Sequence, residues 1–75
     1  MKFRDRMIEA MKEHARGHIA KHKMNVEVYF RNAAGIGGKG NADILEEIEK
    51  ELDIVARYDD QLAMLDKYFP EDING

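Results

Sequence analysis

The chain has 75 residues, enough for one small hydrophobic core in a single domain, residues 1–75, and too few for a second domain. It contains no cysteine, serine or threonine, which excludes disulfides, thiolate metal sites and the commonest nucleophiles of covalent catalysis, so we expect a non-enzymatic protein without a cofactor. The net charge of −3 hides two opposite halves that attract each other, because residues 1–40 carry nine Lys/Arg against four Asp/Glu and residues 41–75 carry three against eleven.

The first predicted helix spans residues 3–30, a segment with no proline and a single glycine, Gly17. An apolar stripe with one histidine recurs along it at an average spacing of about 3.7 residues. This value is closer to a straight amphipathic helix than to the roughly 3.5 of a coiled coil, so we expect little supercoiling. The stripe consists of Ile8, Met11, Ala15, Ile19, His22, Val26 and Phe30.

Residues 24–30 are the ambiguous end of this helix. Val26 and Val28 are β-branched and the segment partly alternates, a pattern that a half-buried strand also shows. We prefer a helix, because a single strand would find no second strand in this chain and would leave its backbone groups unpaired. The strand interpretation stays open only if two copies of the chain pair through it.

Residues 31–40 form the predicted turn, because glycines break a helix and permit positive φ angles. The glycines are Gly35, Gly37, Gly38 and Gly40. This run also matches the Gly-x-Gly-x-x-Gly pattern of phosphate-binding loops and precedes a helix. That fingerprint needs a strand before it and a parallel strand after the helix, for which the sequence offers no candidates, so a plain turn is the preferred interpretation.

The second predicted helix spans residues 43–69 and carries the clearest amphipathic pattern in the chain. Asn41 or Asp43 caps its start, with acidic residues near the positive end of the helix dipole. Pro70 ends it. Its main apolar positions are Leu45, Ile48, Leu52, Val55, Leu62 and Phe69.

The two helices have matched lengths of roughly 40 Å. They predict an all-α fold, an antiparallel helical hairpin with a short frayed tail, residues 70–75, in which only Ile73 could dock. Apolar residues outside the two stripes would stay exposed in a monomer, so we expect a homodimer or higher oligomer, in the simplest case a four-helix bundle. The predicted interface consists of Ile8, Met11, Ala15, Ile19, Val26, Phe30, Leu45, Ile48, Leu52, Val55, Leu62 and Phe69.

Three histidines, His14, His18 and His22, recur every four residues and should form a row along one helix face. Histidines at this spacing can bind Zn²⁺ or Ni²⁺, so the row is a candidate metal site. Surrounding Lys/Arg side chains oppose a cation there, and the one further acidic group expected near His22 in a hairpin is Asp53, as a ligand or an ion-pair partner. Structural or solvated histidines are therefore the preferred interpretation, and a pH-sensitive interface and the metal site are the alternatives.

The basic segment 12–23 could follow a nucleic-acid backbone, because Lys12, Arg16 and Lys23 recur at near-helical steps. The acidic second half would repel phosphates, so we expect these charges to pair within the chain or between copies and do not expect direct nucleic-acid binding. A small metal- or nucleic-acid-binding regulator is the alternative to a protein–protein interaction function.

Four stretches of the chain, Gly17–Val28, Gly35–Gly37, Asp43–Leu52 and Tyr58–Leu62, resemble short uncharacterised proteins of marine tailed phages. The resemblance covers most of the chain and implies no activity and no site residue. It implies a phage gene product, either a minor virion component or a small host-interaction factor.

No apolar run approaches the roughly 20 residues of a membrane-spanning helix, and Met1–Phe3 leads into charged residues rather than the apolar region of a signal peptide. We therefore expect a cytoplasmic protein without a membrane anchor, in the host cytoplasm or the virion if it is phage-encoded. The expected partners are copies of the chain itself and a larger protein assembly.

Overall fold

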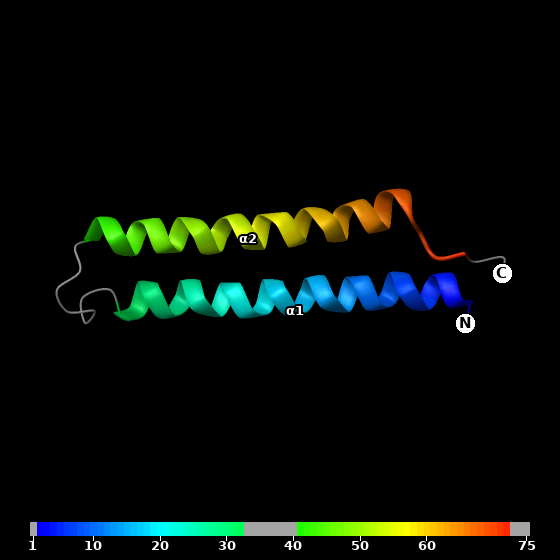
Figure 1. Ribbon diagram of the computed structural model, residues 1–75, viewed down its shortest axis with the longest axis horizontal. Coiled ribbons are helices and arrows are strands. Elements are labelled where there is room, and N and C mark those ends of the chain that lie inside the picture. The colour runs from blue at the N-terminus through cyan, green and yellow to red at the C-terminus, as the bar shows by residue number, and fades with distance from the viewer. Residues whose placement is uncertain (1, 33–40, 73–75) are drawn as a thin grey trace.

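Residues 2–32 and 41–72 are described by the computed structural model, and they form a pair of helices (Figure 1). Helix α1 spans Phe3–Asn32 and helix α2 spans Asn41–Tyr68. The helices lie side by side and antiparallel, so the start of α1 and the end of α2 share one end of the molecule, the open end. The molecule measures 58 × 17 × 13 Å. The predicted all-α hairpin is confirmed.

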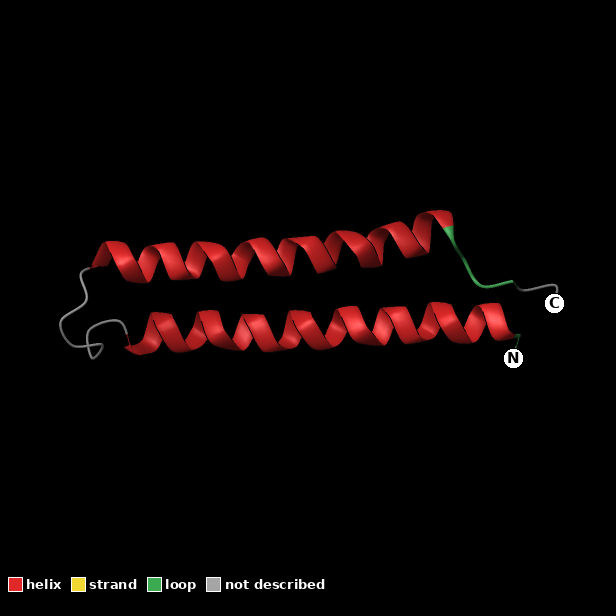
Figure 2. Ribbon diagram, viewed as in Figure 1, coloured by secondary structure: helices red, strands yellow, loops and turns green. Residues whose placement is uncertain are grey.

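Helix α1 continues two residues beyond its predicted end (Figure 2). Residues 24–30 are therefore helical, and the strand interpretation is wrong. Val26 is buried against α2 and Tyr29 packs on the same cluster, because a helix places residues three apart on one face. The glycine-rich turn with its phosphate-loop pattern, and the proposed docking of Ile73, lie outside the described residues.

Helix α2 begins at Asn41, and Asp43 lies in its first turn, where its carboxylate favours the positive end of the helix dipole. The last helical residue is Tyr68, and the N–H of Phe69 still donates to the carbonyl oxygen of Leu65 at 3.0 Å. Phe69 itself lies in a bend, because the ring of Pro70 disfavours helical geometry in the residue before it. The helix thus ends one residue earlier than predicted.

The side chains between the helices recur in alternating steps of three and four residues, which is the heptad spacing of about 3.5. We call them the seam. On α1 they are Asp5, Ile8, Lys12, Ala15, Ile19, His22, Val26 and Tyr29, and on α2 they are Ile44, Ile48, Glu51, Val55, Tyr58, Leu62 and Leu65. All of them are buried or half-buried. The stripe predicted with a spacing of about 3.7 residues therefore agrees with the seam at five of its seven positions and departs from it at Met11 and Phe30.

Five of the twelve predicted interface residues are exposed rather than buried between α1 and α2. They are Met11, Phe30, Leu45, Leu52 and Phe69, with exposed fractions of 50% to 61%. The other seven lie in the seam. Charged residues also occupy seam positions that the predicted apolar stripes did not include. Each of these charged side chains has a hydrogen-bond or ion-pair partner.

The buried hydrophobic core is small. Among the described residues it consists of Ile8, Ala15, Val26, Ile44 and Ile48, and the last three of these form one cluster. Half-buried apolar residues and charged groups of the seam continue the contact along the rest of the hairpin. Neither described helix combines the length and the apolar character needed to cross a membrane.

The tail, as far as it is described, folds back on the start of α1. The backbone N–H of Asp72 donates to Asp5 Oδ1 at 3.1 Å, and Lys2 Nζ lies 2.8 Å from Asp72 Oδ2. Arg4 Nη1 donates to the carbonyl oxygen of Pro70 at 2.9 Å. The expected fraying of the tail is therefore wrong for residues 70–72, because buried Asp5 supplies an acceptor that the sequence did not reveal.

Candidate functional site

Four rings from both helices pack together in the middle of the hairpin, and we call them the histidine–tyrosine cluster: His14, His18, His22 and Tyr58. The ring of His18 lies face to face with Tyr58, with centroids 4.4 Å apart and an angle of 6° between the planes. On its own helix His18 stacks on His22 at 5.8 Å and meets the edge of His14 at 4.6 Å. His18 is therefore the centre of the cluster.

One nitrogen atom of the half-buried His18 imidazole is shielded from solvent. This atom, Nδ1, is buried and has no hydrogen-bond partner among the described residues. Burial lowers the pKa of His18 below its ordinary value of 6.5, because the charged form would lose its hydration. The positive charges of His14, His22, Lys21 and Arg57 lower it further. The neutral ring is thus the favoured form in the folded hairpin.

Glu51 is the polar centre of the adjoining part of the seam. Its Oε2 atom is hydrogen-bonded to Nδ1 of His22, and its Oε1 atom accepts from Nδ2 of Asn25 at 3.1 Å. The prediction that Asp53 lies near His22 is wrong. Asp53 is exposed, whereas Glu51, two residues earlier, occupies the seam position that faces α1.

The arrangement does not support the metal site predicted for His14, His18 and His22. A row with a four-residue repeat stacks the flat faces of His18 and His22, 8° from parallel, instead of directing the ring nitrogens toward one point. No group of three His, Asp or Glu side chains within residues 2–32 and 41–72 could hold a metal ion.

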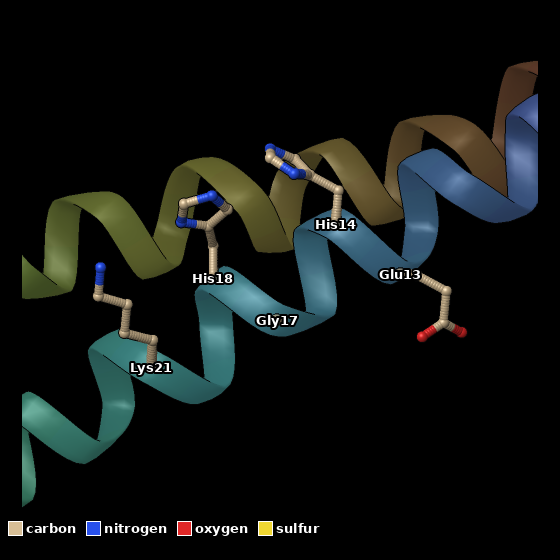
Figure 3. Close-up of a pocket in the computed structure, with 5 residues that line it drawn as sticks. All are labelled: Glu13, His14, Gly17, His18 and Lys21. Atoms are coloured by element: carbon tan, nitrogen blue, oxygen red, sulfur yellow. The ribbon is translucent and has the colours of Figure 1, made fainter.

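An open hollow of about 340 Å³ lies beside the cluster on α1. Its lining is Glu13, His14, Gly17, His18 and Lys21. Figure 3 shows His14 and His18 directed toward α2, with Glu13 directed away from it. A Cβ atom at Gly17 would meet no other atom within 4 Å, so nothing in the hairpin itself requires a glycine there.

Two of the three cations considered for nucleic-acid binding are paired within the chain. Lys12 Nζ lies 2.9 Å from Asp66 Oδ1 and 4.0 Å from Glu9 Oε2, and Arg16 Nη1 lies 3.0 Å from Glu13 Oε1. The hydrogen bond to Asp66 is the main cause that raises the pKa of Lys12. The basic segment 12–23 therefore offers fewer unpaired charges to a phosphate backbone than its sequence indicates.

Two adjoining hollows at the open end of the hairpin, of about 280 and 200 Å³, have almost entirely apolar linings. We call them together the apolar groove, lined by Arg4, Met7, Ile8, Met11, Gln61, Met64, Leu65 and Phe69. Leu65 is a groove residue that the predicted interface omitted, and the heptad spacing of α2 counted from Ile44 would have found it. Gln61 carries no apolar signal that could have found it.

Comparisons of this chain with protein-family models, with curated proteins and with solved structures give no match. Within the described residues, two structural features bear on function. One is the apolar groove, and the other is the histidine–tyrosine cluster.

Proposed function

We propose that the chain is a non-enzymatic assembly protein that binds a second copy of itself through the apolar groove and forms a four-helix bundle. The supporting observation is that the hairpin exposes more large apolar side chains than it buries. Among the described residues, eleven large hydrophobic side chains are exposed and five hydrophobic residues are buried. In a phage, such a bundle would serve as a minor virion component or a host-interaction factor, a role that rests on the sequence resemblance alone.

The shape of the hairpin supports the same proposal. Its accessible surface is 5796 Å², against about 4,700 Å² expected for a compact protein of 8.7 kDa. Its radius of gyration is 17.1 Å, where a compact chain of this length would have about 11 Å. A second hairpin packed alongside the first would cover part of this excess surface.

The apolar groove is the best-suited surface for that contact. Met7, Met11 and Met64 lie around it with about half of each side chain exposed. Methionine is unbranched and adapts its shape, which suits an interface between identical copies. Met7 and Met11 also lie on the same face of α1 as His14 and His18, because alternating steps of four and three residues connect them. The interface can therefore extend from the open end toward the middle.

The opposite net charges of α1 and α2 favour one arrangement of the four helices in this bundle. Within the bounds of α1 the chain carries seven Lys/Arg and four Asp/Glu, and within those of α2 it carries three and nine. A two-fold axis along the bundle places α1 of each copy beside α2 of the other, so opposite charges face each other. Such complementarity fixes orientation more than it adds affinity.

The test is the molar mass in solution, measured by sedimentation equilibrium over a range of concentrations. The wild type is expected at about twice 8.7 kDa. The double variant Met11→Glu/Met64→Glu places charges in the groove and should sediment as a monomer. Ala20→Glu is the matched control, because it adds the same charge to α1 at an exposed position nine residues from Met11, on the opposite side of the helix. A monomeric wild type, or equal effects of both variants, would refute the proposal.

A further inference from the structure

We propose that the histidine–tyrosine cluster is an acid-sensitive latch, in which His18 holds the middle of α1 against α2 only while its imidazole is uncharged. The inference concerns contacts within one hairpin and does not depend on self-association. It rests on the geometry of the cluster and on the charges that face it from both helices.

The geometry disfavours a second proton on His18. Its ring lies between Tyr58 of α2, at 4.4 Å, and His22 of α1, at 5.8 Å, nearly parallel to both. A protonated imidazole has a hydrogen-bond donor on each nitrogen. Nδ1 is buried without a partner among the described residues, so an added N–H there would lack an acceptor. An unsatisfied charged donor is far more costly to bury than an unpaired neutral acceptor.

On α1, the groups around His18 are positive or become positive in acid. His14 touches its ring at 4.6 Å, and Lys21 lies in the same hollow. Glu13 also lines that hollow, but its carboxylate is directed away from the cluster (Figure 3). No group on this helix is therefore placed to compensate a charge on His18 within the described range.

On α2, the neighbouring groups give no compensation either. Tyr58 presents the face of its ring, and the guanidinium of Arg57 lies 5.2 Å from the centroid of that ring on the same helix. Glu51 is the carboxylate nearest to the cluster in the seam, and it is already hydrogen-bonded to His22 and Asn25. A proton on His18 would thus add a positive charge beside Arg57 and Lys21 without a counter-ion.

The direction of the pH effect follows from the lowered pKa of His18. In the unfolded chain this histidine takes up its proton near its ordinary value of 6.5, whereas the folded hairpin resists it until a lower pH. Above that ordinary value, His18 therefore has no effect on folding stability. As the pH falls from that value toward the folded pKa, protonation of the unfolded chain progressively destabilises the hairpin. Weakening would begin in the middle, because the core cluster of Val26, Ile44 and Ile48 lies near one end and the tail contacts lie at the other.

The first experiment compares thermal unfolding of the full chain between pH 7.5 and 5.5 at fixed ionic strength and protein concentration. The wild-type Tm should fall by several degrees over this range. His18→Phe keeps a flat ring against Tyr58 but cannot take up a proton, and it should lose most of that dependence. His14→Gln removes an exposed histidine of the same row and should keep most of it. Equal pH dependence in wild type and His18→Phe would overturn the proposal.

The second experiment uses only the wild type, so it decides the matter even if His18→Phe fails to fold. An NMR titration should show His18 gaining its proton below the ordinary histidine value of 6.5. Amide exchange of residues 14–22, corrected for the intrinsic effect of pH, should accelerate with acid more than that of residues 44–48. Protonation of His18 at or above the ordinary histidine value, or uniform exchange along the hairpin, would contradict an acid-sensitive latch.

Discussion

Lys12 of α1 reaches across the hairpin to Asp66 of α2, with its Nζ atom 2.9 Å from Oδ1. The lysine side chain is 13% exposed and the aspartate side chain 71%. The aliphatic part of Lys12 thus lies in the seam while its ammonium group emerges at the rim beside the carboxylate. A polar seam position of this kind, with a partner on the other helix, favours one register of the two helices over others.

This pair gives a prediction for alkaline solution. The hydrogen bond to Asp66 raises the pKa of Lys12 above its ordinary value of 10.5, so the pair stabilises the hairpin below that pH and the contribution is lost as the pH rises through the folded pKa. Lys12→Met keeps the aliphatic packing, and its Tm should approach that of the wild type between pH 9 and 12. The same difference should shrink in 1 M salt, since the carboxylate is exposed. A Tm difference that changes with neither pH nor salt would show that the ion pair does not stabilise the hairpin.

The structure distinguishes two residues that the sequence had both assigned to the interface. Ile48 is 6% exposed and Leu45 is 61% exposed. Ile48→Ala should lower the free energy of unfolding by about 2–4 kcal/mol, whereas Leu45→Ala should lower it by less than about 1 kcal/mol. Urea unfolding followed by circular dichroism measures both. Equal losses would mean that Leu45 is buried in solution.

Gly17 should be replaceable with a gain in stability. Glycine inside a helix is less favourable than alanine by about 0.5–1 kcal/mol. The added methyl group would find open space, so Gly17→Ala should raise the free energy of unfolding by that amount. Ala20→Gly, at an exposed position of the same helix, should lower it by a similar amount. A loss of stability in Gly17→Ala would indicate that something packs against this position in solution.

The docked tail depends on the carboxylate of Asp5. Asp5→Ala removes the acceptor of the Asp72 N–H, and exchange of that amide should become faster on the order of fivefold, as expected for one hydrogen bond. Asp72→Ala is the matched control, because it keeps the backbone N–H and loses only the ion pair with Lys2. Its residue-72 amide should stay protected. Faster exchange in Asp72→Ala than in Asp5→Ala would show that the side-chain ion pair, and not Asp5, holds the tail.

Local signals predicted both helices well. The segment around Gly17 has no proline, so α1 could be recognised from the absence of strong breakers, and its end at residue 32 falls three residues before Gly35, the first of the following glycines. Pro70 ended α2 within one residue of the expected position. These signals act over a few residues, because helix propensity and backbone sterics are properties of neighbouring residues.

The candidate site was only partly predictable. The four-residue repeat of His14, His18 and His22 did place the three rings in one row. It could not show that Tyr58 would stack on His18, since that contact depends on how far one helix is shifted along the other. The same shift brought Glu51, and not Asp53, to His22.

The sequence by itself determined that this chain is two helices with opposite charge that fold onto each other. Only the tertiary structure decided which side of each helix faces the other. Apolar residues occur on more than one side of α1, so Met11 and Lys12 were both one helical step from Ile8, and the apolar pattern favoured the methionine. Lys12 occupies the seam because Asp66 receives its ammonium group, and that partner lies on the other helix, beyond the reach of any local pattern.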